Sequence, residues 1–241
     1  MRPVGLENRE REEVPENTVL VMKKRAKIIK VENLKTPILY FLYVFIVWTF
    51  YRMNFKYPDV LEELVIKPGI WLLPLLIYVF PKEKTDLAGI GITLKNIFPS
   101  IYLSLALGVG FFFLGLIANI AKYQGVSFGA NIGTISFIPA ILVSFATAVT
   151  EELVFRGYLL GVFMKKYKNL FAVILTTLLW TLIHAPIAYF VWRMDVVQIS
   201  IYLILTFVYG LGASGLFIRT RNLAAPIFLH VLWEWPIILF R

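Results

Sequence analysis

Two histidines and two adjacent glutamates are the residues of this chain best suited to acid–base chemistry. Glu151, Glu152, His184 and His230 all lie within long apolar stretches, and the chain has no other histidine. An ionisable side chain is costly inside a bilayer and tends to mark a functional site there. Carboxylates and imidazoles are common general bases, which take a proton from a reacting group. The set therefore predicts a functional site within the apolar part of the protein.

The residues around the two glutamates separate their roles. Glu152 and Arg156 are four residues apart, so they share one face of a helix and can form an ion pair. Glu151 is rotated by about 100° from Glu152 and points elsewhere. We expect Arg156 to neutralise Glu152, and Glu151 to face a cavity without a cation, where it could act as a general base. The alternative is that the Glu152–Arg156 pair only holds the fold together. A further cation, Lys67, is expected near the end of a span.

Helical rise places Glu151 and His184 at similar depth in the membrane. At ~1.5 Å per residue, Glu151 lies ~21 Å of helix from Lys165, and His184 lies ~24 Å from the other end of the same loop. His230 lies only ~14 Å from Arg221, nearer the cytoplasmic side unless its helix is tilted. We expect the three side chains to converge on one water-filled pocket open to the cytoplasm. Each histidine taken singly is also compatible with a simple interhelical hydrogen bond.

The composition indicates a membrane protein. Hydrophobic residues make up 59% of the 241 residues and charged residues 16%, whereas a soluble domain is about 45–50% apolar and about a quarter charged. We attribute the net charge of +9 to cytoplasmic loops, and not to nucleic-acid binding, because no basic stripe with interleaved aromatic residues lies outside the apolar runs. The chain has no cysteine, which excludes disulfides, thiolate metal sites and cysteine nucleophiles.

Seven apolar runs predict an all-α, polytopic transmembrane helix bundle with about seven to eight spans. The runs are 37–51, 64–80, 97–121, 135–164, 170–188, 196–218 and 224–240. The second contains two prolines and a glycine, so it could be kinked or re-entrant, and the fourth is long enough to be tilted. We interpret Gly210, Gly212 and Gly215 in the sixth run as helix-packing positions.

The chain divides into a tail and a membrane domain. Residues 1–35 mix basic and acidic side chains and predict a cytoplasmic tail, in which 19–31 forms either an interfacial helix or a flexible segment. Residues 36–241 form the transmembrane domain. Lys and Arg are concentrated in alternate loops on the side of the tail, so the positive-inside rule predicts a multi-pass protein of the cell membrane with a cytoplasmic N-terminus.

Three short motifs follow one another between about residues 135 and 235. Residues 151–157 read Glu-Glu-Leu-Val-Phe-Arg-Gly, residues 180–184 place an aromatic residue four positions before a histidine, and residues 222–230 end on His230. They resemble, in order, the EExxxR motif, the aromatic-xxxH motif and the approach to the HxxxN motif of the CPBP family. These intramembrane proteases, also called the Abi family, include the type II CAAX prenyl endopeptidases and bacteriocin-processing enzymes. Weaker similarity is present around 86–94.

The resemblance implies a membrane-embedded endopeptidase that hydrolyses a peptide bond with an activated water. Glu151 with His184 would take the proton from water, and His230 would stabilise the oxyanion. Glu152 and Arg156 would hold the site in place. The alternative mechanism uses Zn²⁺ bound by Glu151, His184 and His230; no other cofactor is expected.

One residue departs from the family pattern. The family usually has Asn or Asp four residues after the last histidine, and this chain has Glu234. An amide can donate a hydrogen bond to an oxyanion, whereas an ionised carboxylate cannot. Glu234 would therefore be protonated, orient His230, bind metal, or mark a changed activity or substrate preference.

The resemblance implies a peptide or prenylated protein substrate reached through the lipid bilayer, with removal of the C-terminal tripeptide of a prenylated CAAX protein as one such reaction. Two other classes stay open. A non-catalytic immunity or scaffold protein of the same family would tolerate the loss of Glu151. A transporter with a Glu/His proton relay would usually show inverted repeats, and the sequence shows none.

Overall fold

The computed structural model of the chain describes residues 34–126 and 137–240, so residues 1–33 of the tail predicted at 1–35 lie outside the described residues. Within these two ranges all regular structure is helical, as predicted. The helices and π-helical segments are α2 (Lys35–Asn54), α3 (Asp59–Leu61), η1 (Glu62–Ile66), α4 (Lys67–Pro74), η2 (Leu75–Val79), α5 (Phe80–Glu83), α6 (Ile97–Tyr123), α7 (Phe137–Glu152), η3 (Leu153–Leu160), α8 (Gly161–Lys166), α9 (Asn169–Pro186), η4 (Ile187–Val191), α10 (Val196–Thr220) and α11 (Ala224–Phe240).

Six helical rods of the described chain are long and apolar enough to cross a membrane. They are Lys35–Asn54, Asp59–Glu83, Ile97–Ile117, Ile138–Lys166, Asn169–Val191 and Val196–Thr220. The seventh predicted run forms α11, whose 17 residues rise about 26 Å and fall just short of a full span. The predicted all-α polytopic bundle is confirmed, with six rods that meet the criteria for a span.

The second rod is continuous and is not a re-entrant loop. Pro68 stands in the first turn of α4 and Pro74 at its end, and π-helical segments η1 and η2 flank the helix. The rod passes through Pro68 without a break, since the backbone N–H of Lys67 just before it donates to the carbonyl of Glu62 in a π-helical hydrogen bond. Since the rod starts at Asp59, Lys67 does not lie near a span end as expected. It is buried in the interior of the bundle.

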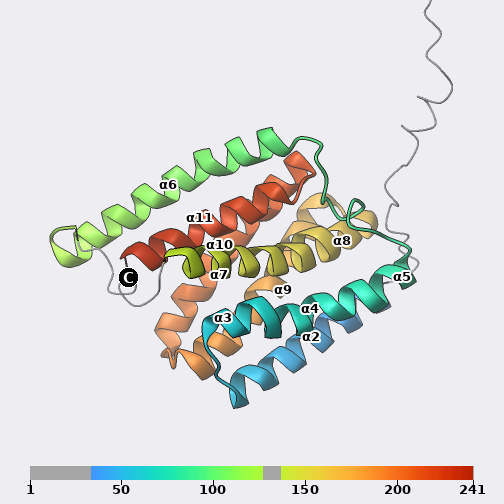
Figure 1. The fold of residues 1–241 in the computed structure, drawn as a ribbon, viewed down its shortest axis with the longest axis horizontal. Coiled ribbons are helices and arrows are strands. Elements are labelled where there is room, and N and C mark those ends of the chain that lie inside the picture. Colours follow the sequence, from blue (N-terminus) through green and yellow to red (C-terminus); the bar gives the residue numbers. More distant parts are fainter. Residues whose placement is uncertain (1–33, 127–136, 241) are drawn as a thin grey trace, which may run out of the picture.

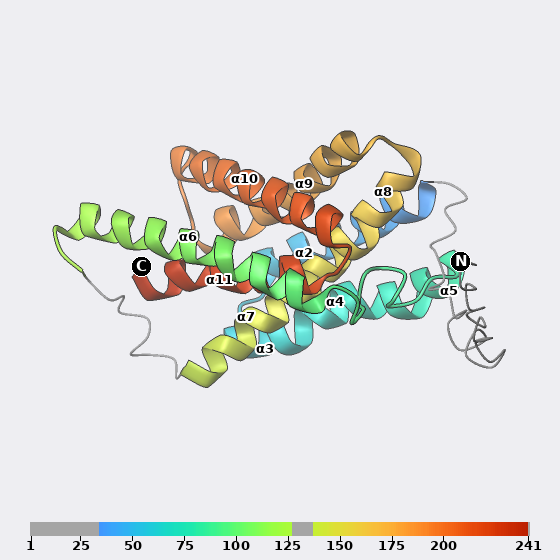
Figure 2. The same ribbon diagram turned by 90° about the horizontal axis from the view of Figure 1, so that it is seen from above.

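The helices α7 and α11 lie in the middle of the bundle. Figure 1 shows them between α6 on one side and the α2–α4 pair on the other. Figure 2 shows α9 and α10 along one face, with α3 and α4 along the opposite face. Helix α11 packs against α6, α7 and α10, and α9 packs against α10 and η3. The four helical elements that carry the predicted site residues are therefore neighbours.

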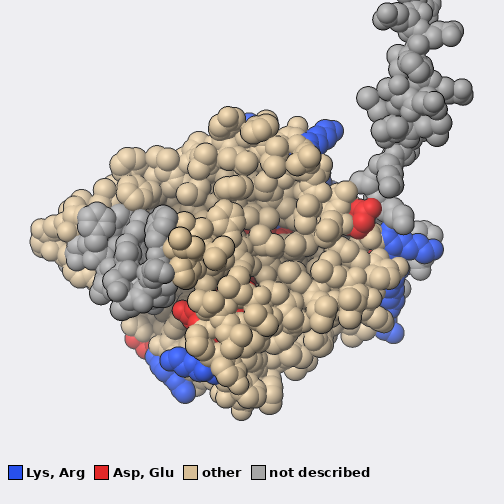
Figure 3. All heavy atoms as spheres, viewed as in Figure 1, with Lys and Arg blue, Asp and Glu red and all other residues tan. Residues whose placement is uncertain are grey.

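The surface of the bundle has the charge distribution of a membrane protein. Figure 3 shows Lys, Arg, Asp and Glu mainly at two ends of the molecule, with a broad uncharged band between them. Large apolar side chains are exposed on the outer faces of the rods, for example Ile77, Phe98 and Val208. A soluble protein rarely exposes contiguous apolar surface on this scale. The band is the surface that lipid tails would cover.

The start of α11 is covered by the segment that joins α5 to α6. The backbone N–H of Leu223 donates to the carbonyl of Gly91 at 2.9 Å. The side-chain amide of Asn222 donates to the carbonyls of Thr93 and Lys95 at 2.8 and 2.7 Å. Asn222 and Leu223 are buried. Helix α11 therefore begins inside the protein, below the surface of the bundle.

Candidate active site

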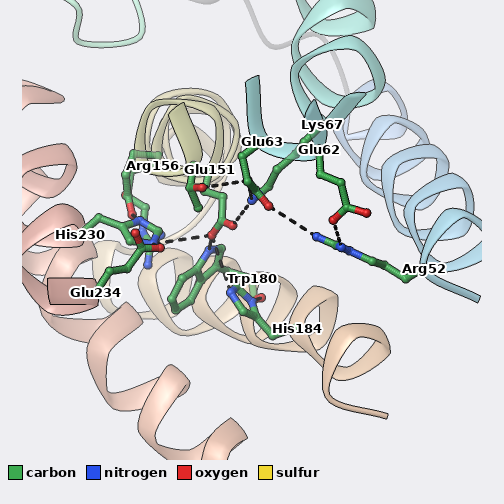
Figure 4. A network of polar contacts seen from close by, with 12 residues as sticks. Arg52, Glu62, Glu63, Lys67, Glu151, Arg156, Trp180, His184, His230 and Glu234 are labelled. Atoms are coloured by element: carbon green, nitrogen blue, oxygen red, sulfur yellow. Dashed lines mark hydrogen bonds and ion pairs between the residues drawn. The ribbon is translucent and has the colours of Figure 1, made fainter. Parts of the chain in front are cut away.

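One oxygen of Glu151 is the centre of the polar cluster between α7, α9 and α11. Glu151 is buried in the last turn of α7, where Oε2 accepts a hydrogen bond from Trp180 Nε1 at 2.7 Å. The Nε2 atoms of His184 and His230 lie 3.7 and 4.0 Å from the same oxygen. Figure 4 shows the two histidines approaching the carboxylate from different helices. The structure brings the three predicted side chains together.

His184 has its ring oriented by the backbone of its own helix. Its Nδ1 lies 2.7 Å from the carbonyl oxygen of Trp180, one turn earlier in α9. Because a carbonyl only accepts, Nδ1 carries the proton, and in the neutral imidazole Nε2 is left as an acceptor. Trp180 thus touches both partners, since its indole N–H holds Glu151 and its carbonyl holds His184. Sequence reasoning placed Trp180 in a motif but gave it no role.

His230 is oriented by the second glutamate. Its Nδ1 lies 2.8 Å from Glu152 Oε1, so Nε2 points away from Glu152. That Nε2 lies 3.5 Å from Glu234 Oε1, one turn further along α11. Helical rise counted from Arg221 places His230 less deep than Glu151 unless the helix is tilted, yet His230 Nε2 lies 4.0 Å from Glu151 Oε2. Because α11 begins at the covered turn of Asn222 and Leu223, helical rise counted from Arg221 underestimates the depth of His230.

The expected Glu152–Arg156 pair is present. Arg156 Nη1 lies 3.0 Å from Glu152 Oε1, and both side chains are fully buried. The guanidinium of Arg156 also lies over the Trp180 ring, 4.5 Å from its centroid, and donates to the carbonyl of Gly210 at 3.3 Å. Arg156 therefore stabilises both Glu152 and Trp180, so this ion pair is connected to the Glu151 cluster.

The expectation that Glu151 has no cationic partner is wrong. Lys67 Nζ lies 2.6 Å from Glu151 Oε1. This contact joins α4 to α7 across 84 residues of sequence, and the local pattern around Glu151 carries no signal of it. The two oxygens of Glu151 have different partners, because Lys67 binds Oε1 and the histidines face Oε2.

Charged side chains extend the cluster towards α2. Lys67 Nζ lies 2.8 Å from Glu63 Oε2, and Arg52 Nη2 lies 3.4 Å from Glu63 Oε1. Arg52 also pairs with Glu62, and Figure 4 shows the resulting chain from Arg52 to Glu151. Sequence analysis missed these residues, although the four-residue spacing of Glu63 and Lys67 on one helix was a usable signal.

The accessible side of the cluster is formed by His184 and Glu234. Their side chains are 16% and 26% exposed, whereas those of Glu151 and His230 are each 5% exposed. The cluster is therefore most accessible on the side of these two residues.

Two histidines and a carboxylate are a ligand set that Zn²⁺ uses. In the described parts of the chain, however, no three His, Asp or Glu side chains are grouped as a metal-binding site. Both Glu151 oxygens already accept a hydrogen bond, and Lys67 places a positive charge on the same carboxylate. These residues suit a metal-free site better than a zinc site.

The geometry agrees with a comparison to protein families. Residues 133–236 match the family described as Type II CAAX prenyl endopeptidase Rce1-like. Residues 133–236 therefore form a region of the CAAX protease family type. The matched region contains Glu151, Glu152, His184 and His230, and it excludes Lys67. No curated protein and no solved structure matches the chain. Family and fold together identify a multi-pass membrane protein of CAAX protease type.

Proposed function

We propose that this protein is an intramembrane endopeptidase in which Glu151 and His184 activate a water molecule for attack on a peptide carbonyl. The observation that carries the proposal is the convergence of the two Nε2 atoms on Glu151 Oε2, at 3.7 and 4.0 Å. Both separations exceed a direct hydrogen bond, and a water standing beside Oε2 and the imidazole nitrogens could hydrogen-bond to the carboxylate and to a histidine at once.

The water would donate one hydrogen bond to Glu151 Oε2 and one to His184 Nε2. Nε2 is an acceptor because Nδ1 of that ring faces the Trp180 carbonyl. As the water oxygen bonds to the carbonyl carbon, its proton passes to this pair. The pair then returns the proton to the leaving amine, so the peptide bond breaks and an acid and an amine are released.

His230 would stabilise the negative charge that develops on the carbonyl oxygen. Its Nε2 is directed into the cluster by the Nδ1–Glu152 contact at 2.8 Å. A histidine whose Nδ1 faces a carboxylate is favoured in the doubly protonated form, which donates from Nε2. Glu234 lies at the same Nε2 and would, in its protonated form, supply a second donor.

The proposed substrate is a prenylated protein or peptide with a C-terminal CAAX sequence, cleaved near the membrane surface. The apolar band of the bundle would let the prenyl chain stay in lipid while the peptide enters between His184 and Glu234. We further propose that the N-terminus is cytoplasmic and that the protein resides in the cell membrane, in accordance with the excess of Lys and Arg in the loops on that side.

The test is cleavage of a prenylated CAAX peptide by the purified full-length protein, beside Glu151→Gln and His184→Asn, with and without chelator. We expect release of the tripeptide by wild type, a loss of at least about 1,000-fold in kcat for Glu151→Gln, and no effect of the chelator. Asp86→Asn, in an exposed loop, is the control. Full cleavage by Glu151→Gln would exclude Glu151 as the base, and cleavage abolished by chelator but restored by Zn²⁺ would favour the metal mechanism. A properly folded protein that cleaves neither this peptide nor a mixed membrane-peptide library would point to a non-catalytic family member.

A further inference from the structure

We infer that Lys67 is a positioning residue of the active site, which holds Glu151 as a carboxylate with Oε2 aimed at the two histidines. This inference rests on the proposed role of Glu151 as the base. Lys67 belongs to α4, outside the region that matches the protease family.

The position of Lys67 leaves it few alternative partners. Its side chain is 5% exposed, and Nζ lies 2.6 Å from Glu151 Oε1 and 2.8 Å from Glu63 Oε2. A buried ammonium is tolerated only when it is paired. The ring of Trp71 lies on one side, with its centroid 5.3 Å from Nζ. The ammonium is thus fixed between two carboxylates from different helices.

Two donors from different helices fix the orientation of the Glu151 carboxylate. Lys67 on α4 binds Oε1, and Trp180 on α9 binds Oε2. Rotation of the carboxylate about its last bond would break both hydrogen bonds. Each carboxylate oxygen has two lone pairs, so Oε2 keeps one after binding Trp180. The two contacts leave that lone pair on the side of His184 and His230.

Glu63 moderates the effect of the ammonium. An ammonium bound only to Glu151 would neutralise it and weaken it as a base. Here Lys67 divides its charge between two carboxylates, and Glu63 Oε2 also accepts from Thr147 Oγ1 at 2.8 Å. Thr147 lies one turn before Glu151 on α7, so Glu63 is held against the same helix. The ammonium of Lys67 is thus shared between Glu151 and Glu63 and is not bound to Glu151 alone.

A fold role and a positioning role for Lys67 predict different results in a double mutant. Lys67→Met leaves the buried Glu151 without its cation and leaves Glu63 with Arg52 alone, which should lower stability whatever the role of Lys67. Adding Glu63→Gln removes the second negative charge beside Glu151 and should recover part of the stability. It cannot recover the lost contact to Glu151 Oε1. If Lys67 has a fold role only, kcat should recover together with stability in the double mutant. If Lys67 positions Glu151, kcat should stay low while stability recovers.

The experiment measures kcat, KM and the midpoint of thermal unfolding for full-length Lys67→Met, Lys67→Arg, Glu63→Gln and Lys67→Met/Glu63→Gln on the prenylated CAAX peptide. Lys82→Met, which removes an exposed lysine from the same helical rod, is the matched control. We expect Lys67→Met to lower kcat about 100-fold, as for a misplaced catalytic group, with KM changed less than about threefold. The double mutant should regain unfolding temperature but not kcat, and Lys67→Arg should regain part of kcat.

Recovery of kcat together with stability in the double mutant would overturn the inference and leave Lys67 with a fold role only. Wild-type kcat in Lys67→Met would overturn it as well. Either result, combined with an inactive Glu151→Gln, leaves the proposed function intact. Full activity of Glu151→Gln would instead count against the proposed function itself.

Discussion

His230 Nδ1 lies 2.8 Å from Oε1 of Glu152, the same oxygen that Arg156 binds at 3.0 Å. Glu152 therefore links the ion pair within the α7–η3 rod to the histidine of α11. The second glutamate of the motif thus sets the direction of His230 without touching the proposed water.

Glu152→Gln should impair both stability and catalysis. The substitution leaves Arg156 buried without a charged partner, a change that typically costs about 3–5 kcal/mol. It also weakens the contact that aims His230, so we expect kcat to fall about 100-fold in the protein that stays folded. Thermal unfolding in detergent and the peptide assay would measure the two effects. Unchanged kcat in folded Glu152→Gln would show that His230 does not depend on Glu152.

Gly210→Ala should disturb the site from α10. A Cβ atom at this position would lie 2.7 Å from Thr177 Cγ2, 3.0 Å from Trp180 Cε3 and 3.2 Å from Arg156 Nη2. Such overpacking typically costs about 1–3 kcal/mol, and here it would push the indole that binds Glu151. We expect lower stability and lower kcat.

Gly212→Ala and Gly215→Ala are the matched controls on the same helix. No atom lies within 4 Å of a Cβ at either position, and alanine favours helix over glycine by about 1 kcal/mol. Both variants should retain wild-type kcat. Equal losses in all three alanine variants would mean that α10 itself, and not contact with Trp180, is sensitive to substitution.

Asn222→Ala should affect stability more than chemistry. Asn222 Oδ1 accepts a hydrogen bond from the backbone N–H of Ala224 at 2.8 Å and so caps α11. The side-chain amide of Asn222 donates to two carbonyls of the segment that joins α5 to α6. Loss of a cap costs about 1 kcal/mol, and buried carbonyls left without a partner cost more. We expect an unfolding midpoint several degrees lower, with kcat nearly unchanged at low temperature. A selective loss of kcat would mean that this turn also sets the depth of His230.

Glu234→Gln should distinguish the roles open to Glu234. If Glu234 is protonated and donates to the oxyanion, the amide of glutamine can replace it, and kcat should stay within about tenfold of wild type. Glu234→Leu, which removes every donor, should lose activity. The peptide assay compares the two variants directly. Equal loss in both would favour a need for the carboxylate charge.

Depth calculated from helical rise was correct for two residues whose helices leave the same loop. Glu151 and His184 lie on rods joined at 167–168, and their side chains meet as rise along each helix predicts. Counted from Arg221, the same arithmetic places His230 less deep than its contact with Glu151 shows, because the turn before α11 is covered by the segment that joins α5 to α6. The sequence contains no local sign of that cover.

The contact of Lys67 with Glu151 could not be predicted from the sequence. Prolines around Lys67 indicated an interrupted segment, whereas π-helical segments keep the rod continuous and carry the lysine inward. Periodicity describes one helix at a time, and this contact depends on how α4 packs against α7. Charged pairs within one helix, such as Glu152–Arg156, were predictable because four residues of spacing define them.

The chain of ion pairs from Arg52 to Glu151 also decides how the protein could be shortened. A fragment limited to 133–236, the part that matches the family, would keep both histidines but lose α2 and α4. Its Glu151 would then face lipid without a cation, at a cost of several kcal/mol. A shortened protein that keeps this chain of ion pairs intact therefore begins no later than α2.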